Sequence, residues 1–380
     1  MSEEFTALMN NGTWSLVPSQ PHFNVIGNKW VFRLKRNPDG SIARYKAQLV
    51  AKGFHQRPGI DYKDTFSLVI KPQIIKIVLC IALSKVYVDD LLLTGNDVSF
   101  LAKFKAALAT KFSLKDPRTS SHFLGIELLP TTNVMFLSQQ HYIRDILQKG
   151  NMIDAKPVGT PMSTTCSLSS HDDTPSCDSS LFHNIIGSLH YLSITRPDVA
   201  FAVNKLSLYM QAPKTTHMQA LKRILRYLKH TISHGLQLVA TKNLDLTAFC
   251  EANWGGDTND KKSTGAYIVY LGPNAISWSC KKQSIVARSS TEVEYRTIGL
   301  MAFKLLWLQE LLLELGIKLT KQPTIFSYNI GATYLCANPI FHSRMKHLVI
   351  EYHFVHDIVA KGELKVSHVS FQSLTSKLAN

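Results

Sequence analysis

The 380-residue chain carries 42 Lys and Arg against 27 Asp and Glu, a net charge of +15, and 45% of its residues are hydrophobic. This length suffices for two or three domains that each bury a core, and the hydrophobic content excludes a wholly disordered chain. The positive charge favours a polyanionic partner, most simply nucleic acid, although a basic protein without such a partner has the same composition.

Six cysteines are scattered along the chain without a Cys-x-x-Cys pair, so the sequence predicts neither a zinc site nor a disulfide framework. No apolar run is long enough to cross a membrane, and no apolar leader follows the acidic start Met1–Glu4. We therefore expect a soluble, intracellular protein without a membrane partner. The sequence does not separate cytoplasm from nucleus, and it leaves the oligomeric state open.

Two alternating runs between Lys29 and Lys52 flank the turn sequence Asn37–Ser41, which predicts a β-hairpin. One face of this hairpin is apolar and the other is basic. The basic residues are Lys29, Arg33, Lys35, Arg44 and Lys46. They form either a solvated face or a surface that contacts phosphates.

Two adjacent carboxylates, Asp89 and Asp90, follow Tyr87 and Val88 inside an apolar run. At the tip of a tight hairpin such a pair binds the Mg²⁺ ions that carry a nucleoside triphosphate, and the alternative is an ordinary turn. Around this hairpin we predict helices over 72–83 and 100–112, strands over 123–129 and 134–138, and a helix over 140–149.

Residues 156–180 are rich in Ser, Thr, Pro and Asp, with little to bury, and we expect a linker there. Residues 181–234 are predicted to be largely helical. A basic cluster at helical spacing lies in this region, at Lys222, Arg223, Arg226 and Lys229. It is either a surface that contacts a phosphate backbone or a solvated helix face.

The last third of the chain predicts three strands, a long helix, and then alternating strands and helices. The strands are expected at 246–250, 265–271, 275–279, 324–328 and 364–369, and the helices up to Gly316 and at 330–337 and 350–361. The long helix has an apolar stripe, Ile298, Met301, Leu305, Leu308 and Leu312. This order is typical of a ribonuclease H-like α/β layer.

Ordered motifs in all three parts of the chain resemble those of the Pol polyprotein of copia-type LTR retrotransposons. They are Asn11–Val17, Lys29–Phe32, Tyr45–Phe54, Tyr87–Asp90, Gly187–Leu192, Thr195–Asp198, Ile276–Ser279, Lys281–Gln283, Ser289–Tyr295 and Arg344–His347. The resemblance implies an α/β (α+β) protein. Its expected parts are reverse transcriptase fingers and partial palm (1–84), a palm remnant (85–155), a linker (156–180), a helical thumb or connection (181–243) and a ribonuclease H-like domain (244–380).

The sequence departs from the family pattern at both implied metal sites. A long block separates helix 72–83 from the Tyr-Val-Asp-Asp hairpin in the family, whereas Leu83–Val86 joins them directly here. That block carries the first metal-binding aspartate of the palm, so Asp89 and Asp90 are half a site. Of the four ribonuclease H carboxylates, only Glu294 is unchanged. The other three positions hold Glu251, Tyr328 and Ser376.

We therefore expect a retrotransposon-derived Pol fragment that is catalytically inactive. Mg²⁺ is its ancestral cofactor, and the residues left to bind it, Asp89, Asp90, Glu251 and Glu294, do not hold it productively. The alternatives are a protein that binds RNA, DNA or their hybrid without sequence preference, and a weak residual ribonuclease H. A further alternative is that splicing or the gene model removed the missing block.

Overall fold

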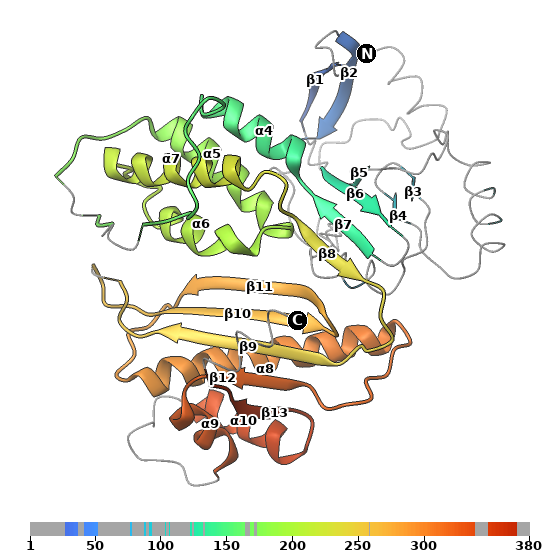
Figure 1. Ribbon diagram of the computed structural model, residues 1–380, viewed down its shortest axis with the longest axis vertical. Coiled ribbons are helices and arrows are strands. Elements are labelled where there is room, and N and C mark those ends of the chain that lie inside the picture. The colour runs from blue at the N-terminus through green and yellow to red at the C-terminus, as the bar shows by residue number, and fades with distance from the viewer. Residues whose placement is uncertain are drawn as a thin grey trace, which may run out of the picture. The chain divides into compact units, whose positions relative to one another are not determined.

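The computed structural model describes residues 27–36, 42–51, 77, 87–88, 91–92, 103, 106, 122–123, 125–131, 134–163, 168–170, 173–257, 259–338 and 349–370 (Figure 1). The chain divides between Val69 and Ile70 into two units, and each is described by itself. Among the described residues, no helix combines the length and the apolar character that a membrane span requires.

The first unit contains the predicted hairpin. Strand β1 (Asn28–Arg36) pairs antiparallel with β2 (Ile42–Ala51), from Asn28 opposite Ala51 to Lys35 opposite Arg44. The register shifts between Lys35 and Arg36, next to the predicted turn. The alternating pattern and the turn sequence thus predicted this hairpin correctly.

The second unit begins with short strands. Strands β3 (Tyr87–Val88) and β4 (Leu91–Leu92) form a two-stranded antiparallel sheet. A four-stranded antiparallel sheet has the order β5 (His122–Phe123), β6 (Ile126–Pro130), β7 (Val134–Ser138) and β8 (Leu236–Val239). The sequence did not predict β8, because its four residues follow a long helical region and pair with a strand about a hundred positions earlier.

A helical layer follows, and its order confirms the prediction for 181–234. It contains α4 (Gln140–Lys149), α5 (Ser179–Tyr191), the short 3₁₀ turns Leu192–Ile194 and Pro197–Val199, α6 (Ala200–Ser207) and α7 (Thr215–His230). Asp178 caps α5 by accepting a hydrogen bond from the Leu181 amide (3.0 Å). The helices enclose a core of their own that includes Ile143, Ile146, Phe182, Ile186, Leu221 and Leu225.

The motif Thr195–Asp198 connects these helices through side-chain hydrogen bonds. The Arg196 side chain is 1% exposed and donates through Nε and Nη2 to the two carboxylate oxygens of Asp198 (2.9 and 2.7 Å). It also donates to the backbone oxygen and to Oγ1 of Thr231, just after α7 (3.0 and 2.6 Å). Thr195 donates to Oε1 of Gln139, at the start of α4 (2.6 Å). The motif is therefore a largely buried polar network that joins the 3₁₀ turns to α4 and α7.

The Ser/Thr/Pro-rich segment 156–180 differs from the expected linker in its packing. Its described residues contain no helix or strand before Ser179, but Leu168 is buried in the helical core. The backbone oxygen of Leu168 accepts a hydrogen bond from the Tyr209 hydroxyl (2.8 Å), and that of Pro175 accepts one from the Thr215 amide (2.9 Å). The composition thus predicted the lack of regular structure. It did not predict that the segment packs on the helical core, because the segment has few hydrophobic residues.

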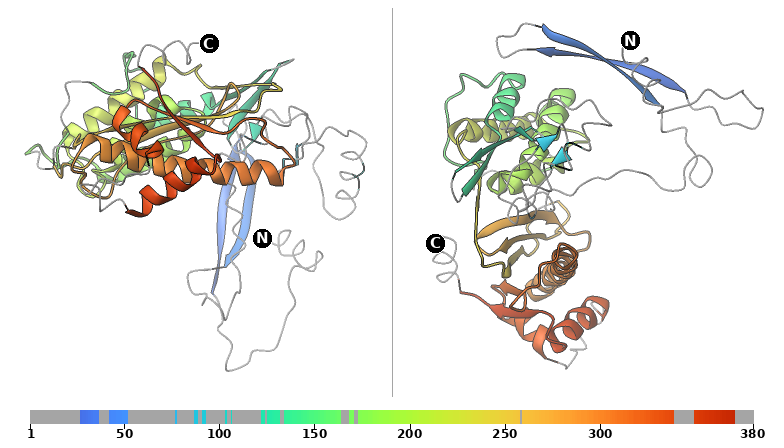
Figure 2. Two further views of the ribbon diagram at one scale, coloured as in Figure 1. Left: turned by 90° about the horizontal axis from the view of Figure 1, so that it is seen from below. Right: turned by 90° about the vertical axis from the view of Figure 1, so that its right-hand side faces the viewer.

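The last part of the chain forms a five-stranded sheet of order β11 (Asn274–Lys282), β10 (Thr264–Leu271), β9 (Leu246–Asn253), β12 (Thr324–Ser327) and β13 (Lys365–His368). The first three strands are antiparallel, and β12 is parallel to both β9 and β13. Helices α8 (Ser290–Glu314), α9 (Ile330–Ala337) and α10 (Val349–Ala360) pack together (Figure 2). This is the predicted ribonuclease H-like α/β order.

Helix α8 shows why the sequence folds this way locally. The Ser289 hydroxyl accepts a hydrogen bond from the Glu292 amide (3.2 Å), and the Glu292 carboxylate accepts one from the Arg288 amide (2.8 Å). Gly316 ends the helix with φ of +77°, which a side chain would strain. Every residue of the predicted apolar stripe is fully buried against the sheet.

Candidate active site

The two carboxylates expected in the ribonuclease H-like domain meet at one end of β9. Along this strand Ala248 and Cys250 are buried, whereas Glu251 is exposed. Glu294 projects from α8 and accepts a hydrogen bond through Oε1 from the Ala252 amide (2.9 Å), the residue next to Glu251. The negative charge of Glu251 acts on Glu294. The structure therefore brings the two predicted carboxylates together.

Glu294 lies in a place that favours its protonated form. The residue is 5% exposed, and burial together with the nearby charge of Glu251 raises its pKa to about 7. The Ala252 amide and the Ser327 hydroxyl, which lies 3.4 Å from Oε2, oppose this shift without cancelling it. The protonated form of Glu294 therefore persists to a higher pH than that of an ordinary glutamate.

The third expected carboxylate position lies just after β12. Tyr328 stands there, and burial and the charge of Glu251 raise the pKa of its phenol, so it supplies no anionic oxygen near neutral pH. Sequence reasoning missed Ser327, the buried hydroxyl before it that binds Glu294. Strand alternation was the available signal, because it places Ser327 and Tyr328 on opposite faces of the sheet. Ser376 lies outside the described residues.

These residues do not fit a two-metal centre. Two Mg²⁺ ions in a nuclease need several anionic oxygens between them, and among the described residues Glu251 and Glu294 supply two carboxylate side chains. In the part of the chain that the structure describes, no three His, Cys, Asp or Glu side chains are grouped as metal ligands would be. Among the described residues, the donor set at this end of β9 thus consists of two carboxylates, where the expected chemistry uses four.

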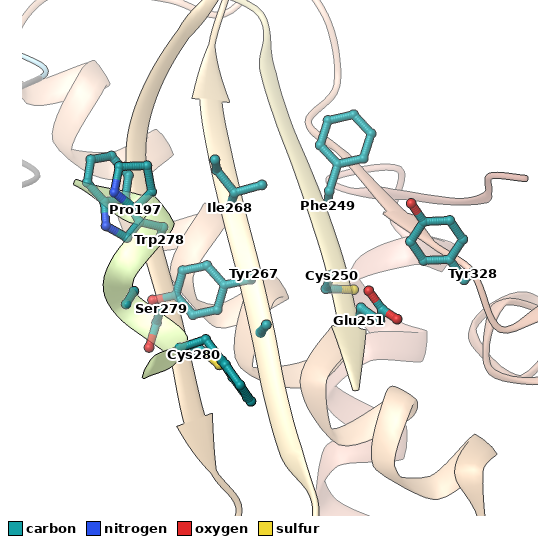
Figure 3. Close-up of a pocket in the computed structure, with 13 residues that line it drawn as sticks. Pro197, Phe249, Cys250, Glu251, Tyr267, Ile268, Trp278, Ser279, Cys280 and Tyr328 are labelled. Atoms are coloured by element: carbon teal, nitrogen blue, oxygen red, sulfur yellow. The ribbon is translucent and has the colours of Figure 1, made fainter. Parts of the chain in front are cut away.

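A pocket of about 360 Å³ lies on the sheet beside Glu251 (Figure 3). Its walls are mainly aromatic and aliphatic, and Glu251 is the one carboxylate among the residues that line it. Figure 3 shows Glu251 and Tyr328 on one side and Trp278 beside Pro197 on the other. The pocket therefore places apolar surface beside the Glu251 carboxylate.

The hairpin that carries the predicted polymerase carboxylates is described only in part. Strands β3 and β4 confirm the hairpin, since Val88 pairs with Leu91. Asp89 and Asp90 themselves lie outside the described residues, so their metal role stays a prediction.

The register of β1 and β2 groups the basic positions of the first unit. Arg33 is opposite Lys46 and Lys35 is opposite Arg44, and positions two apart along a strand belong to the same face. Lys29, Arg33, Lys35, Arg44 and Lys46 therefore share one face of the hairpin. The predicted division into a basic and an apolar face agrees with this register.

The basic cluster on α7 is divided between solvent and the chain itself. Lys222 is exposed and Lys229 is half-buried. Arg223 donates through Nη2 to the Thr160 hydroxyl (2.7 Å), and Arg226 donates through Nε to the Lys156 backbone oxygen (2.6 Å). Two of the four predicted phosphate-binding side chains thus already have partners in segment 156–160.

Comparison with known proteins identifies the family to which the chain belongs. A family model described as "Reverse transcriptase (RNA-dependent DNA polymerase)" matches residues 11–85 and 82–164. The chain is 41% identical over 462 residues to the "Retrovirus-related Pol polyprotein from transposon RE1" of Arabidopsis thaliana, which covers 97% of this chain and 32% of that polyprotein. It is 31% identical to a protein of transposon Ty5-1 from Saccharomyces cerevisiae, over 56% of this chain and 70% of that protein. The chain belongs to the copia-type family of retrotransposon Pol polyproteins.

The chain spans about a third of the length of its copia-type relative RE1. A solved foamy viral protease-reverse transcriptase in complex with RNA/DNA hybrid aligns with 73% of this chain and 34% of that chain, at 12% identity and a TM-score of 0.42.

The match to the family model is interrupted where the sequence predicts a missing block. The two matches to the family model meet and overlap at residues 82–85. The RE1 alignment extends over 462 positions, whereas 97% of 380 residues is about 369, so about 93 positions of the alignment have no residue of this chain. Both findings agree with an internal gap relative to other copia-type Pol proteins.

Proposed function

We propose that this chain is a copia-type Pol fragment whose ribonuclease H-like domain keeps its fold without two-metal hydrolysis. The observation that carries this proposal is the set of oxygen donors at the end of β9. Glu251 and Glu294 are the carboxylates that the described residues place there. The resemblance implies a third carboxylate where Tyr328 stands, and the phenol of Tyr328 supplies no anionic oxygen near neutral pH. Because metal ions carry most of the catalysis in such nucleases, a site that cannot hold them does not cleave.

The same conclusion extends to polymerisation. The two matches to the family model meet at residues 82–85, and the resemblance implies that the block missing there carries the first palm aspartate, its strand and a covering helix. Phosphoryl transfer to a primer needs metal ions bridged by that aspartate, so Asp89 and Asp90 alone do not support it.

We expect no hydrolysis of an RNA/DNA hybrid by the full chain in Mg²⁺ or Mn²⁺. The triple variant Glu251→Asp, Tyr328→Asp and Ser376→Asp should recover measurable cleavage, because together with Glu294 it restores four carboxylates. No single reversion should suffice, since the carboxylates hold the metal ions as a set. The measurement is release of labelled RNA fragments from a hybrid duplex.

The control for contaminating nuclease is Glu294→Ala, alone and combined with the triple variant. Cleavage by the unmodified chain that Glu294→Ala removes would show an active site and refute the proposal. Cleavage by the triple variant that survives Glu294→Ala would come from another enzyme.

A second function, binding of nucleic acid without sequence preference, is favoured by the shared basic face of the β1–β2 hairpin and the net charge of +15. Such faces contact phosphates, and their affinity falls steeply with salt because counterions are released. On α7, Lys222 and Lys229 are the stronger candidates for contacting phosphates, because Arg223 and Arg226 already bind segment 156–160.

We expect the double variant Lys222→Gln and Lys229→Gln to reduce the slope of log affinity against log salt by about one unit for each phosphate that it no longer binds. The assay is binding of a labelled hybrid across a salt series. The matched control, Lys318→Gln with Lys361→Gln, removes the same charge from exposed positions elsewhere. Equal slopes for the two double variants would show that α7 does not contact the duplex.

A further inference from the structure

Segment 156–163 lies on the surface of α7 and is hydrogen-bonded to Arg223 and Arg226. Arg226 donates to the Lys156 backbone oxygen (2.6 Å), and its own backbone oxygen accepts from the Val158 amide (3.4 Å). Two residues further on, the exposed Thr160 accepts a hydrogen bond from Arg223 Nη2 (2.7 Å). The next residue is Pro161. An exposed hydroxyl thus lies against a guanidinium group.

The guanidinium of Arg223 is only partly used. In arginine the Nε–H bond and one N–H bond of Nη2 point the same way, which forms an edge for two acceptor oxygens. In Arg223 the Nη2 end of this edge meets Thr160, while Nε is buried and has no hydrogen-bond partner among the described residues. A buried donor without a partner is uncommon and destabilising.

Another arginine of this chain shows the same edge fully satisfied. Arg196 donates from Nε and Nη2 to both carboxylate oxygens of Asp198, at 2.9 and 2.7 Å. An anion with two oxygens beside Arg223 would complete its edge in the same way. The only hydroxyl that the structure shows on this edge is that of Thr160.

We propose that Thr160 is a phosphorylation site whose phosphate is held by the Nε and Nη2 edge of Arg223. The Thr160 oxygen attacks the γ-phosphorus of ATP bound to a proline-directed Ser/Thr protein kinase. The new O–P bond forms as the bond to the β–γ bridging oxygen breaks, ADP leaves, and the hydroxyl proton passes to the base of the kinase. Pro161 restricts Thr160 to extended backbone conformations, which suits a peptide lying in a kinase cleft.

The charges around Thr160 suit a dianion. Helix α7 contains no acidic residue, and it carries Lys222 and Arg226 on either side of Arg223. A phosphate of about −1.5 to −2 charge opposite arginines forms short, charge-assisted hydrogen bonds that order the segment bearing it. Phosphorylation is therefore expected to fasten residues 156–163 more firmly to α7 and to neutralise Arg223.

The test treats the folded full-length chain with a purified proline-directed Ser/Thr kinase and MgATP, and maps the product by mass spectrometry. We expect phosphate on Thr160, and Thr160→Val should remove it. Thr174, which also precedes a proline, serves as an internal comparison. Failure of the folded chain to accept phosphate at Thr160, while a peptide of residues 154–166 accepts it, would overturn the proposal.

The role of Arg223 is tested by ³¹P NMR titration of the phosphorylated protein. Pairing should lower the second phosphate pKa by about one unit from its ordinary value of about 6, and Arg223→Gln should return it. Arg223→Lys, which keeps the charge without the paired edge, should give an intermediate pKa, and Arg144→Gln, on α4, should change nothing. Equal pKa values in the wild type and Arg223→Gln would overturn the proposal. If Arg223→Gln does not fold, native and urea-unfolded wild type are compared, and equal values there would overturn it as well.

Discussion

Replacement of Arg196 by leucine is expected to lower the free energy of unfolding by about 3–5 kcal/mol, because it removes one partner of a buried ion pair. The change leaves Asp198 without its guanidinium partner and leaves the backbone oxygen and hydroxyl of Thr231 without their donors. Asp198 is a third exposed, so water will restore part of its solvation and the loss should lie toward the lower end. Urea denaturation followed by circular dichroism gives the measurement.

The matched control is Arg144→Leu, which makes the same change on the exposed side of α4. It should alter stability by less than about 0.5 kcal/mol. Similar losses in the two variants would show that the network of Arg196 does not stabilise the helical layer.

Glu294→Gln is expected to stabilise the chain by about 3 kcal/mol above pH 8. The folded chain holds the Glu294 proton up to a pKa of about 7, whereas an unfolded glutamate loses it near 4.5. The contribution of Glu294 to the free energy of unfolding is therefore complete below pH 4.5 and is lost as the pH rises through 7. Each unit of difference between the folded and unfolded pKa corresponds to about 1.36 kcal/mol. Glutamine is uncharged, keeps Oε1 for the Ala252 amide, and offers an N–H to the Ser327 hydroxyl.

Stability measured from pH 4 to pH 9 should decline less steeply in Glu294→Gln than in the wild type. Glu310→Gln removes a carboxylate from an exposed position of the same helix and should leave the pH dependence unchanged. A variant that is less stable than the wild type at pH 8 would mean that the ionised carboxylate stabilises the fold.

Elements with a strong period were predictable from the sequence. The apolar stripe of α8 has a helical spacing, and all five of its residues are buried against the sheet. The hairpin of β1 and β2 combines alternation with a turn sequence. Both signals are local, because burial of one face imposes a period on neighbouring residues.

Contacts between distant residues were not predictable. Arg223 and Arg226 have the spacing of a free basic face, yet their partners lie 63 and 70 positions earlier in a segment with few apolar residues. The motif identified Glu294 as a carboxylate position, but its pKa depends on burial and on Glu251, which the motif does not encode. Ser327 entered the site because a parallel strand brings it beside β9.

The position of β9 at the centre of its sheet also affects how this chain folds while it is being synthesised. One edge of β9 pairs with β10, which follows within about twenty residues. The other edge can pair only after β12 has been made, because Thr247 pairs with Thr324. A ribosome must therefore translate past residue 324 before this sheet can close, and β13 emerges later still. Until then the nascent chain presents an unpaired apolar strand, which is the type of surface that chaperones bind and that aggregates when they are absent.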